Sequence, residues 1–241
     1  RRITLSTASG EQETVETEEI LVAAGRKGNT DGLDLEKAGV TVERSFIPVN
    51  DRLQTSQKHI YAAGDINGRF LFTHVAGAEG SLFVRRAVLH AGGRMDYTNV
   101  PWVTYCDPEL ASVGYNEQRA QAEGLNYRAI VQDFGVNDRA HAEGETTGRL
   151  KILIDRKDRV LGAQITGYHA GDLITPALYA RAEGWKLSRI RSAWMPYPTM
   201  GEVWGKAISG HLAPRLFNPR VRRILRVLFR YRGDGPQPGA H

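Results

Sequence analysis

The stretch from residue 62 to 80, AAGDINGRFLFTHVAGAEG, places an aspartate and several glycines just before a helical pattern. Asp65 and Gly64 follow the apolar run Ile60–Ala63, which predicts a short buried strand. Open α/β sheets bind ligands at such strand ends, and a carboxylate there can accept hydrogen bonds from a sugar-like diol. The positive end of the predicted helix Thr73–His90 would stabilise an electron-rich ring. We therefore predict a cofactor site, with a plain strand, turn and capped helix as the alternative.

The net charge of +5 belongs to the C-terminal end of the chain. From His211 onward seven arginines face one acidic residue, Asp234, so this end carries +6 and the first 210 residues carry −1. No helix-turn-helix, zinc-finger or RNA-binding signature accompanies the charge, so we predict no nucleic-acid partner.

Cysteine content and hydropathy exclude several further classes. Cys106 is the only cysteine, which excludes an intrachain disulfide and a cysteine zinc cluster, and the seven histidines are scattered, so we predict no metal site. We expect a lone cysteine in a strand-like segment to be a small buried apolar residue. No apolar run is long enough to span a membrane and no secretory signal opens the sequence, so we expect a cytoplasmic protein.

The first hundred residues show short strand patterns. An antiparallel hairpin is predicted from Ile3–Thr7 and Thr14–Thr17, which the turn residues Ser9 and Gly10 separate. Further short strands are predicted at Glu19–Ala24, Val40–Val42 and Ile47–Val49, with a helix or turn at Leu35–Ala38.

Pro101 marks a predicted domain boundary, beyond which strands precede helices. This order is typical of an α+β domain. The predicted strands are Trp102–Tyr105, Leu110–Val113, Tyr127–Phe134, Arg149–Ile154 and Val160–Thr166, and the predicted helices are Asn116–Gly124, Asp172–Glu183 and Thr199–Ser209.

Four motifs, in this order, make residues 18 to 210 resemble one family, the flavin-dependent pyridine nucleotide-disulfide oxidoreductases. Dihydrolipoamide dehydrogenase, glutathione reductase and mercuric reductase belong to it. The motifs are EEILVAAGRKGNTDGLDLEKAGV (18–40), TSQKHIYAAGDI (55–66), PELASVGYNEQRA (108–120) and PYPTMGE (196–202).

The resemblance implies an α/β and α+β fold and a homodimer. Residues 1–99 would be the remnant, at its C-terminal end, of the NAD- and FAD-binding domains. Residues 100–212 would form the α+β dimerisation domain, an antiparallel sheet with flanking helices. Residues 213–241 would form a basic amphipathic tail.

The resemblance also implies FAD and NAD(P)H as cofactors. Asp65 would bind the ribityl chain of the flavin, and Gly64 would let the backbone approach it. Thr73, His74 and Val75 would form the helix start that faces the pyrimidine end of the flavin ring, where negative charge develops on reduction.

Two features of the family are missing from this sequence. It contains neither a GxGxxG phosphate loop nor a pair of redox cysteines. We expect these upstream of Arg1, so that the chain is the C-terminal half of such an enzyme and is inactive alone.

In family members that act on dithiols, the loop resembling PYPTMGE carries a histidine and, five positions later, a glutamate that act as general acid and base. Here Tyr197 stands at the histidine position and Glu202 at the glutamate position. A tyrosine titrates near pKa ~10 and a histidine near ~6.5, so Tyr197 would mainly donate a hydrogen bond at neutral pH. This disfavours dihydrolipoamide and glutathione and favours a mercuric-reductase-like enzyme, although the C-terminal cysteine pair of that enzyme is absent. The alternative is a packed interface tyrosine.

The tail RLFNPRVRRILRVLFRYR (215–232) predicts a basic amphipathic helix that Asn218 caps and Pro219 begins. Such a helix can lie on an anionic membrane, at the inner face in a cytoplasmic protein. The alternative is packing on its own subunit or on the sister subunit. The apolar stripe is Phe217, Val221, Ile224, Leu225 and Leu228, and the residues of the other faces are Arg222, Arg223, Arg226 and Arg230.

We consider two functions from different classes. The first is the C-terminal portion of a flavin-dependent NAD(P)H oxidoreductase that passes electrons to a disulfide, a metal ion or another acceptor. The second is a non-enzymatic dimerisation module with a membrane-associating tail.

Overall fold

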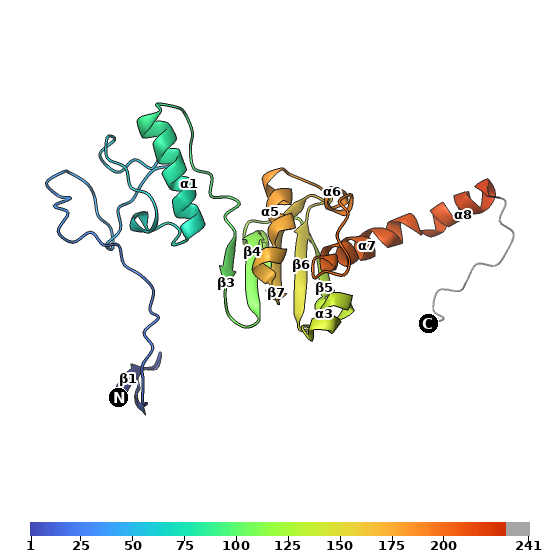
Figure 1. Cartoon of the computed structure of the whole chain (residues 1–241), viewed down its shortest axis with the longest axis horizontal. Coiled ribbons are helices and arrows are strands. Elements are labelled where there is room, and N and C mark those ends of the chain that lie inside the picture. Colours follow the sequence, from blue (N-terminus) through green and yellow to red (C-terminus); the bar gives the residue numbers. More distant parts are fainter. Residues whose placement is uncertain (230–241) are drawn as a thin grey trace. The chain divides into compact units, whose positions relative to one another are not determined.

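The computed structural model describes residues 1–229 and divides the chain into two compact units (Figure 1). The first unit is Arg1–Met95 and the second begins at Asp96. We describe each unit by itself.

The first unit opens with the predicted hairpin. Strand β1 (Arg2–Ser6) pairs antiparallel with β2 (Gln12–Glu16), with Ile3 opposite Val15. Gly10 in the turn has φ +85°, a left-handed conformation that glycine adopts at little cost.

The predicted strand Glu19–Ala24 does not form. Leu21 and Val22 are 92% and 80% exposed, and no neighbouring strand lies beside them in the described chain. A strand is stable only when another strand completes its hydrogen bonds, so the sequence pattern alone is insufficient here.

The predicted strands Val40–Val42 and Ile47–Val49 do not form either, and an isolated bridge joins Glu43 and Phe46 between them. In the predicted run Ile60–Ala63, only Tyr61 makes a bridge, to Gln54. Apolar residues of these segments nevertheless pack together, with Val40, Ile47 and Ala62 at the centre. The hydrophobic pattern therefore predicted burial correctly but not the ladder of hydrogen bonds.

The long helix of the unit begins at the predicted residue. Helix α1 (Thr73–Phe83) continues into a π-helical segment (Val84–Val88), so the helical stretch ends shortly before the predicted end at His90. A single 3₁₀ turn, Asp65–Asn67, precedes α1.

The second unit contains a five-stranded sheet in which all neighbours are antiparallel. This arrangement confirms the predicted antiparallel sheet with flanking helices. The strand order is β3 (Trp102–Thr104), β4 (Glu109–Gly114), β7 (Val160–Gly167), β6 (Gly148–Ile154) and β5 (Arg128–Asp133).

Apolar and polar side chains alternate along the strands of this sheet, so one face is apolar and is covered by helices. In β6, Leu150 and Ile152 are fully buried, whereas Arg149 and Lys151 point to the other face. Helices cover the apolar face, on which α7 packs against β5 and β6, and α5 against β7 (Figure 1). The helices of this layer are α4 (Ala170–Leu173), α5 (Thr175–Ala182), α6 (Leu187–Arg191) and α7 (Glu202–Leu216).

Helix caps explain several boundaries of the second unit. Asn116 accepts a hydrogen bond from the Arg119 backbone N–H at 2.9 Å and begins α2 (Glu117–Ala122), as predicted. Two short helices, α3 (Asp138–Glu143) and α6, were not predicted. The single helix predicted at Asp172–Glu183 is divided into α4 and α5, with a proline in the first turn of α5.

Cys106 differs from its expected environment. Its side chain is exposed because β3 ends at Thr104 and Cys106 lies in the turn before β4. The thiol donates to the carbonyl of Pro108 at 3.1 Å. The prediction of a buried apolar cysteine was therefore wrong.

The end of α7 is attached to the turn between β6 and β7. Asp158 in that turn accepts hydrogen bonds from Arg215 and, at 3.3 Å, from His211, and pairs with Arg128 of β5 at 2.6 Å. Burial alone would raise the pKa of Asp158, but these hydrogen bonds and positive charges lower it below the ordinary value. The attachment extends α7 beyond its predicted end at Ser209.

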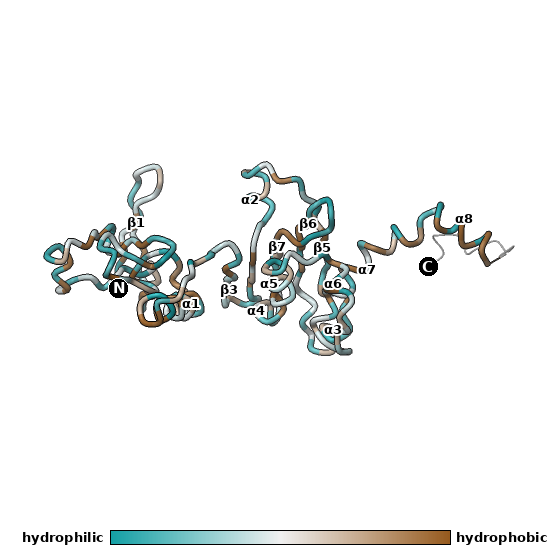
Figure 2. Tube along the Cα trace, turned by 90° about the horizontal axis from the view of Figure 1, so that it is seen from above, coloured by the Kyte–Doolittle hydropathy of each residue, from teal (hydrophilic) through white to brown (hydrophobic). Residues whose placement is uncertain are grey.

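The predicted tail helix forms as α8 (Pro219–Leu228), with Asn218 accepting from the Val221 N–H at 3.0 Å. Apolar and polar residues alternate along it (Figure 2), and its large apolar side chains remain exposed. Arg230 and the rest of the predicted tail, residues 231–241, lie outside the described residues. Within residues 1–229, every helix is too short or too polar to cross a membrane.

Candidate functional site

The loop after the apolar run Ile60–Ala63 is packed against the first turn of α1. Gly64 is buried with φ +79°, and a Cβ atom at this position would lie only 3.2 Å from the Ala76 Cβ. Asp65 begins the 3₁₀ turn, and its Oδ2 pairs with the Arg26 guanidinium at 2.5 Å. The Asp65 side chain is 40% exposed, so its carboxylate can accept further hydrogen bonds.

A buried carboxylate of α1 holds this loop. Glu79 is 1% exposed, and its Oε2 accepts from the Gly64 backbone N–H at 2.6 Å and from Asn67 Nδ2 at 2.8 Å. These hydrogen bonds hold the loop on both sides of Asp65, through the Gly64 backbone and the Asn67 side chain. Sequence analysis did not single out Glu79, although an isolated acid within an otherwise apolar helix is a usable signal for a buried partner.

The first turn of α1 carries no acidic side chain that would offset the positive end of the helix. The N-cap residue, Phe72, supplies no side-chain hydrogen bond. Val75 is buried, whereas Thr73 and His74 are exposed, and the His74 ring stacks on Phe72 with centroids 5.3 Å apart. Gly64, Asp65, Thr73, His74 and Val75 are thus brought to one end of α1.

The second predicted pair lies in the other unit, where Tyr197 makes a specific contact with α3. Its hydroxyl donates to Asp138 Oδ2 at 3.1 Å, and Lys206 pairs with Asp138 at 3.5 Å. The hydrogen bond to Asp138 and the negative charge of Asp138, with a smaller contribution from Glu202, raise the pKa of the Tyr197 phenol. Tyr197 is therefore held in its protonated form.

Glu202 is the first residue of α7 and lies close enough to Tyr197 for its charge to act on that phenol. Its Oε2 is shielded from solvent and has no hydrogen-bond partner among the described residues. A buried acceptor without a donor is costly, so this oxygen is suited to receive a hydrogen bond from a bound molecule.

Asn137 fixes the loop that carries Tyr197. It is fully buried, and its amide nitrogen donates to the carbonyls of Thr199 at 3.2 Å and Met200 at 3.1 Å. Its amide oxygen caps α3 by accepting from the Arg139 N–H at 2.9 Å. Because α3 was not predicted, sequence analysis missed both Asn137 and Asp138.

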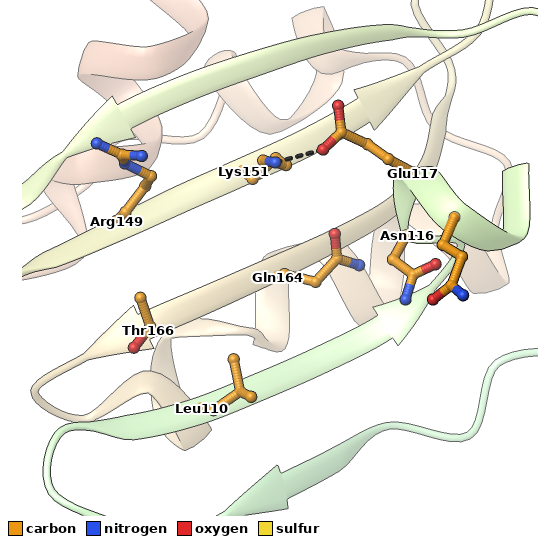
Figure 3. Close-up of a pocket in the computed structure, with 8 residues that line it drawn as sticks. Leu110, Asn116, Glu117, Arg149, Lys151, Gln164 and Thr166 are labelled. Carbon is orange, nitrogen blue, oxygen red and sulfur yellow. Dashed lines mark hydrogen bonds and ion pairs between the residues drawn. The ribbon is translucent and has the colours of Figure 1, made fainter. Parts of the chain in front are cut away.

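The open face of the sheet carries a separate polar groove of about 420 Å³ (Figure 3). Glu117 at the start of α2 forms an ion pair with Lys151 of β6 across it, and Arg149 pairs with Asp133 at 2.6 Å. The strongest charges of the groove are thus satisfied within the chain. Among the described residues, no cluster of three or more His, Cys, Asp or Glu is arranged to hold a metal ion.

Two family models match the chain over most of its length. Residues 2–80 match the pyridine nucleotide-disulphide oxidoreductase model, and residues 100–208 match the dimerisation domain of the same family. The chain belongs to the pyridine nucleotide-disulphide oxidoreductase family. Members of this family are oxidoreductases that use FAD and NAD(P)H.

Curated relatives include two of the enzymes named by the resemblance. The chain is 36% identical over 196 residues to a mercuric reductase of Staphylococcus aureus, covering 80% of this chain and 36% of the relative. It is 37% identical over 198 residues to a dihydrolipoyl dehydrogenase of Geobacillus stearothermophilus, covering 81% and 42%. The chain thus spans less than half the length of these relatives. The near-equal identities do not distinguish between similarity to a mercuric reductase and similarity to a dihydrolipoyl dehydrogenase.

Solved structures show the same relationship. LpdA from Mycobacterium tuberculosis matches 86% of this chain and 45% of its own, with a TM-score of 0.77 and 25% identity. The match to the HOCl-induced flavoprotein disulfide reductase RclA from Escherichia coli covers 86% of this chain and 48% of RclA, with a TM-score of 0.77 and 28% identity.

The residues of the first unit fit part of a flavin site. At Gly64 an added Cβ would lie 3.2 Å from the Ala76 Cβ and φ is +79°, so glycine lets the loop before Asp65 lie close against α1. The exposed Asp65 carboxylate is a suitable acceptor for sugar hydroxyls, and the start of α1 offers a positive dipole without an acid to neutralise it. The phosphate-binding glycine loop that would complete such a site is not part of this sequence.

Proposed function

We propose that this chain is the C-terminal part of a flavin-dependent NAD(P)H oxidoreductase. The observation that carries the proposal is the loop Gly64–Asn67, which the buried Glu79 fixes against the first turn of α1. A loop that only connected two elements would not require a fully buried carboxylate for its support. When bound, FAD would supply the hydride acceptor for NAD(P)H and the electron donor for the second substrate.

In this proposal Asp65 accepts hydrogen bonds from the ribityl hydroxyls, while Gly64 keeps the backbone close to them. Thr73, His74 and Val75 direct the positive end of α1 at the part of the ring where negative charge develops. The ion pair of Asp65 with Arg26 keeps the carboxylate oriented before the cofactor is in place.

Tyr197 and Glu202 would act on the acceptor side. The Tyr197 phenol stays protonated at neutral pH, with its hydroxyl hydrogen directed to Asp138, so this residue does not remove a proton from the acceptor. Glu202 offers its unpartnered Oε2 as an acceptor. We propose a homodimer in which Asp65 and the start of α1 of one subunit meet Tyr197 and Glu202 of the other.

The acceptor would be a disulfide, a metal ion or another small molecule. A protonated tyrosine at the family's histidine position argues against dithiols as substrates, because oxidation of a dithiol to a disulfide needs a group that accepts the thiol proton near neutral pH. The non-enzymatic alternative receives no support from the relatives, which are named as reductases and dehydrogenases.

The experiment that tests the function uses the full-length protein purified with its flavin under anaerobic conditions. Adding NADH or NADPH should remove the visible absorbance of the flavin. The Asp65→Ala variant should contain less bound flavin than the wild-type protein. A wild-type protein that carries no flavin, or a flavin that neither nucleotide reduces, would contradict the proposal.

We also propose that the tail contacts an anionic membrane surface, so that a cytoplasmic enzyme is held at the inner face. In α8 four arginines and no acidic residue accompany exposed apolar side chains. This composition is typical of a helix that lies in the lipid headgroup region. Two copies of α8 would repel each other, which argues against pairing of α8 with itself.

A further inference from the structure

A second cavity, of about 290 Å³, lies along α7 beside Glu202. One wall is a single face of α7, where Glu202, Lys206 and Ser209 stand four and then three residues apart. The opposite wall comes from Arg191 at the end of α6 and from Met195 in the loop that leads to Tyr197. From Glu202 to Ser209 the helix rises by roughly 10 Å, so the cavity has two distinct ends.

The two ends differ in charge. At one end is the buried Glu202 Oε2, which lacks a donor among the described residues. At the other end the Arg191 Nε donates to Ser209 Oγ at 3.1 Å, and no carboxylate of the described chain lies within ion-pair distance of this guanidinium. The terminal nitrogens of Arg191 therefore offer donors to a ligand.

Lys206 connects the cavity with the candidate catalytic tyrosine. Its ammonium group lines the cavity and also pairs with Asp138, which accepts the hydrogen bond from Tyr197. A molecule that contacts Lys206 in the cavity is thus linked to the Tyr197 phenol through the ion pair of Lys206 with Asp138. The groove on the open sheet face has no such connection, and its charges are already paired.

We propose that this cavity is a subsite for an anionic electron acceptor. A carboxylate or similar group of the acceptor binds the Arg191 guanidinium, with support from Ser209 and Lys206. The other end of the acceptor carries a hydrogen-bond donor that faces Glu202. This inference rests on the proposed function, because it assigns the class of acceptor, but the binding itself needs no flavin chemistry.

The first test is a binding measurement on the full-length protein with unreactive probes. Ligand-observed NMR titrations compare benzoate, an aromatic carboxylate, with benzamide, its neutral counterpart. Benzoate should bind the wild-type protein more tightly than benzamide, and Arg191→Gln should weaken benzoate binding by about tenfold or more, the effect of one charge-assisted hydrogen bond. Arg189→Gln is the matched control, since Arg189 lies on the same helix but contacts Trp185 outside the cavity.

The second test measures turnover with two disulfides, the anionic 5,5′-dithiobis(2-nitrobenzoate) and the neutral 4,4′-dithiodipyridine. Arg191→Gln should raise the KM for the anionic disulfide about tenfold and leave its kcat unchanged. The KM and kcat for the neutral disulfide should stay at their wild-type values. Equal benzoate binding by wild type and Arg191→Gln, or no preference for benzoate over benzamide, overturns the subsite even if the flavin is active. A flavin that NAD(P)H does not reduce, together with charge-selective binding, contradicts only the proposed function.

Discussion

The Tyr197 hydroxyl donates a hydrogen bond to Asp138 Oδ2 at 3.1 Å, joining a loop and a helix that are 59 residues apart in sequence. This contact raises the pKa of Tyr197 above the ordinary tyrosine value, because ionisation of the phenol would both break the hydrogen bond and place two negative charges side by side. A residue that the sequence presents as a substitute for a histidine base is therefore a fixed donor in the structure.

The first prediction concerns this pair. Asp138→Asn should lower the pKa of Tyr197 toward the ordinary tyrosine value, because the negative charge that opposes ionisation is removed. Ultraviolet titration of the phenolate, with Tyr197→Phe as the reference that removes the signal of this residue, measures the change. An unchanged titration of Tyr197 in Asp138→Asn would show that the contact does not control its ionisation.

The second prediction concerns the support beneath Asp65. Glu79→Gln should destabilise the protein by about 1–3 kcal/mol and reduce its flavin content, because the amide is a weaker acceptor for Gly64 and Asn67. Denaturant unfolding and the flavin-to-protein absorbance ratio give the two readouts. Glu36→Gln, an exposed site in the same unit, is the control and should change neither. Full flavin content in Glu79→Gln would argue against a supporting role.

The third prediction concerns the attachment of α7. Asp158→Asn should destabilise the second unit by about 1–2 kcal/mol at pH 7, a modest value because the paired arginines are half exposed. The pKa of Asp158 is lowered in the folded protein, so its contribution is present above the unfolded pKa and is lost as pH falls below about 4. The difference between variant and wild type should therefore shrink at pH 3.

Urea unfolding at both pH values measures this effect. Asp172→Asn, whose side chain is 89% exposed, is the control and should behave like wild type. A difference between Asp158→Asn and wild type that is the same at pH 7 and pH 3 would refute the assigned linkage.

The fourth prediction concerns the tail. Replacing Arg222, Arg223 and Arg226 with Gln should weaken binding to anionic vesicles on the order of 100-fold, since each basic residue contributes about 1 kcal/mol at such a surface. Co-sedimentation with phosphatidylglycerol vesicles provides the measurement. Replacing the exposed Arg44, Arg156 and Lys157 with Gln removes the same charge elsewhere and should have little effect. Binding that survives the tail substitutions would exclude the membrane contact through α8.

Local signals in the sequence were sufficient where the structure depends on local hydrogen bonds. Asn116 and Asn218 begin α2 and α8 because their side chains accept from the backbone N–H three residues later. The Gly64–Asp65 turn and the start of α1 at Thr73 were equally readable. The apolar pattern also predicted the strands of the second unit, whereas their antiparallel sheet was implied by the resemblance to the family.

Features that depend on distant partners could not be read in the same way. The segment Glu19–Ala24 has the composition of a strand but has no neighbouring strand in the described chain. Asp138 matters only because the fold brings it to Tyr197, and Cys106 is exposed because β3 ends at Thr104 and the cysteine lies in the turn that follows. The environment of these residues is decided by tertiary packing.

The central claim is a flavin reductase site shared between two subunits, and heterodimer complementation tests it most directly. One chain carries Asp65→Ala, and the other carries Tyr197→Phe together with Glu202→Gln. Each homodimer should be nearly inactive. If the site combines Asp65 of one subunit with Tyr197 and Glu202 of the other, the purified heterodimer has one intact site and should recover about half of the wild-type activity. A heterodimer no more active than its two parents would contradict the shared site.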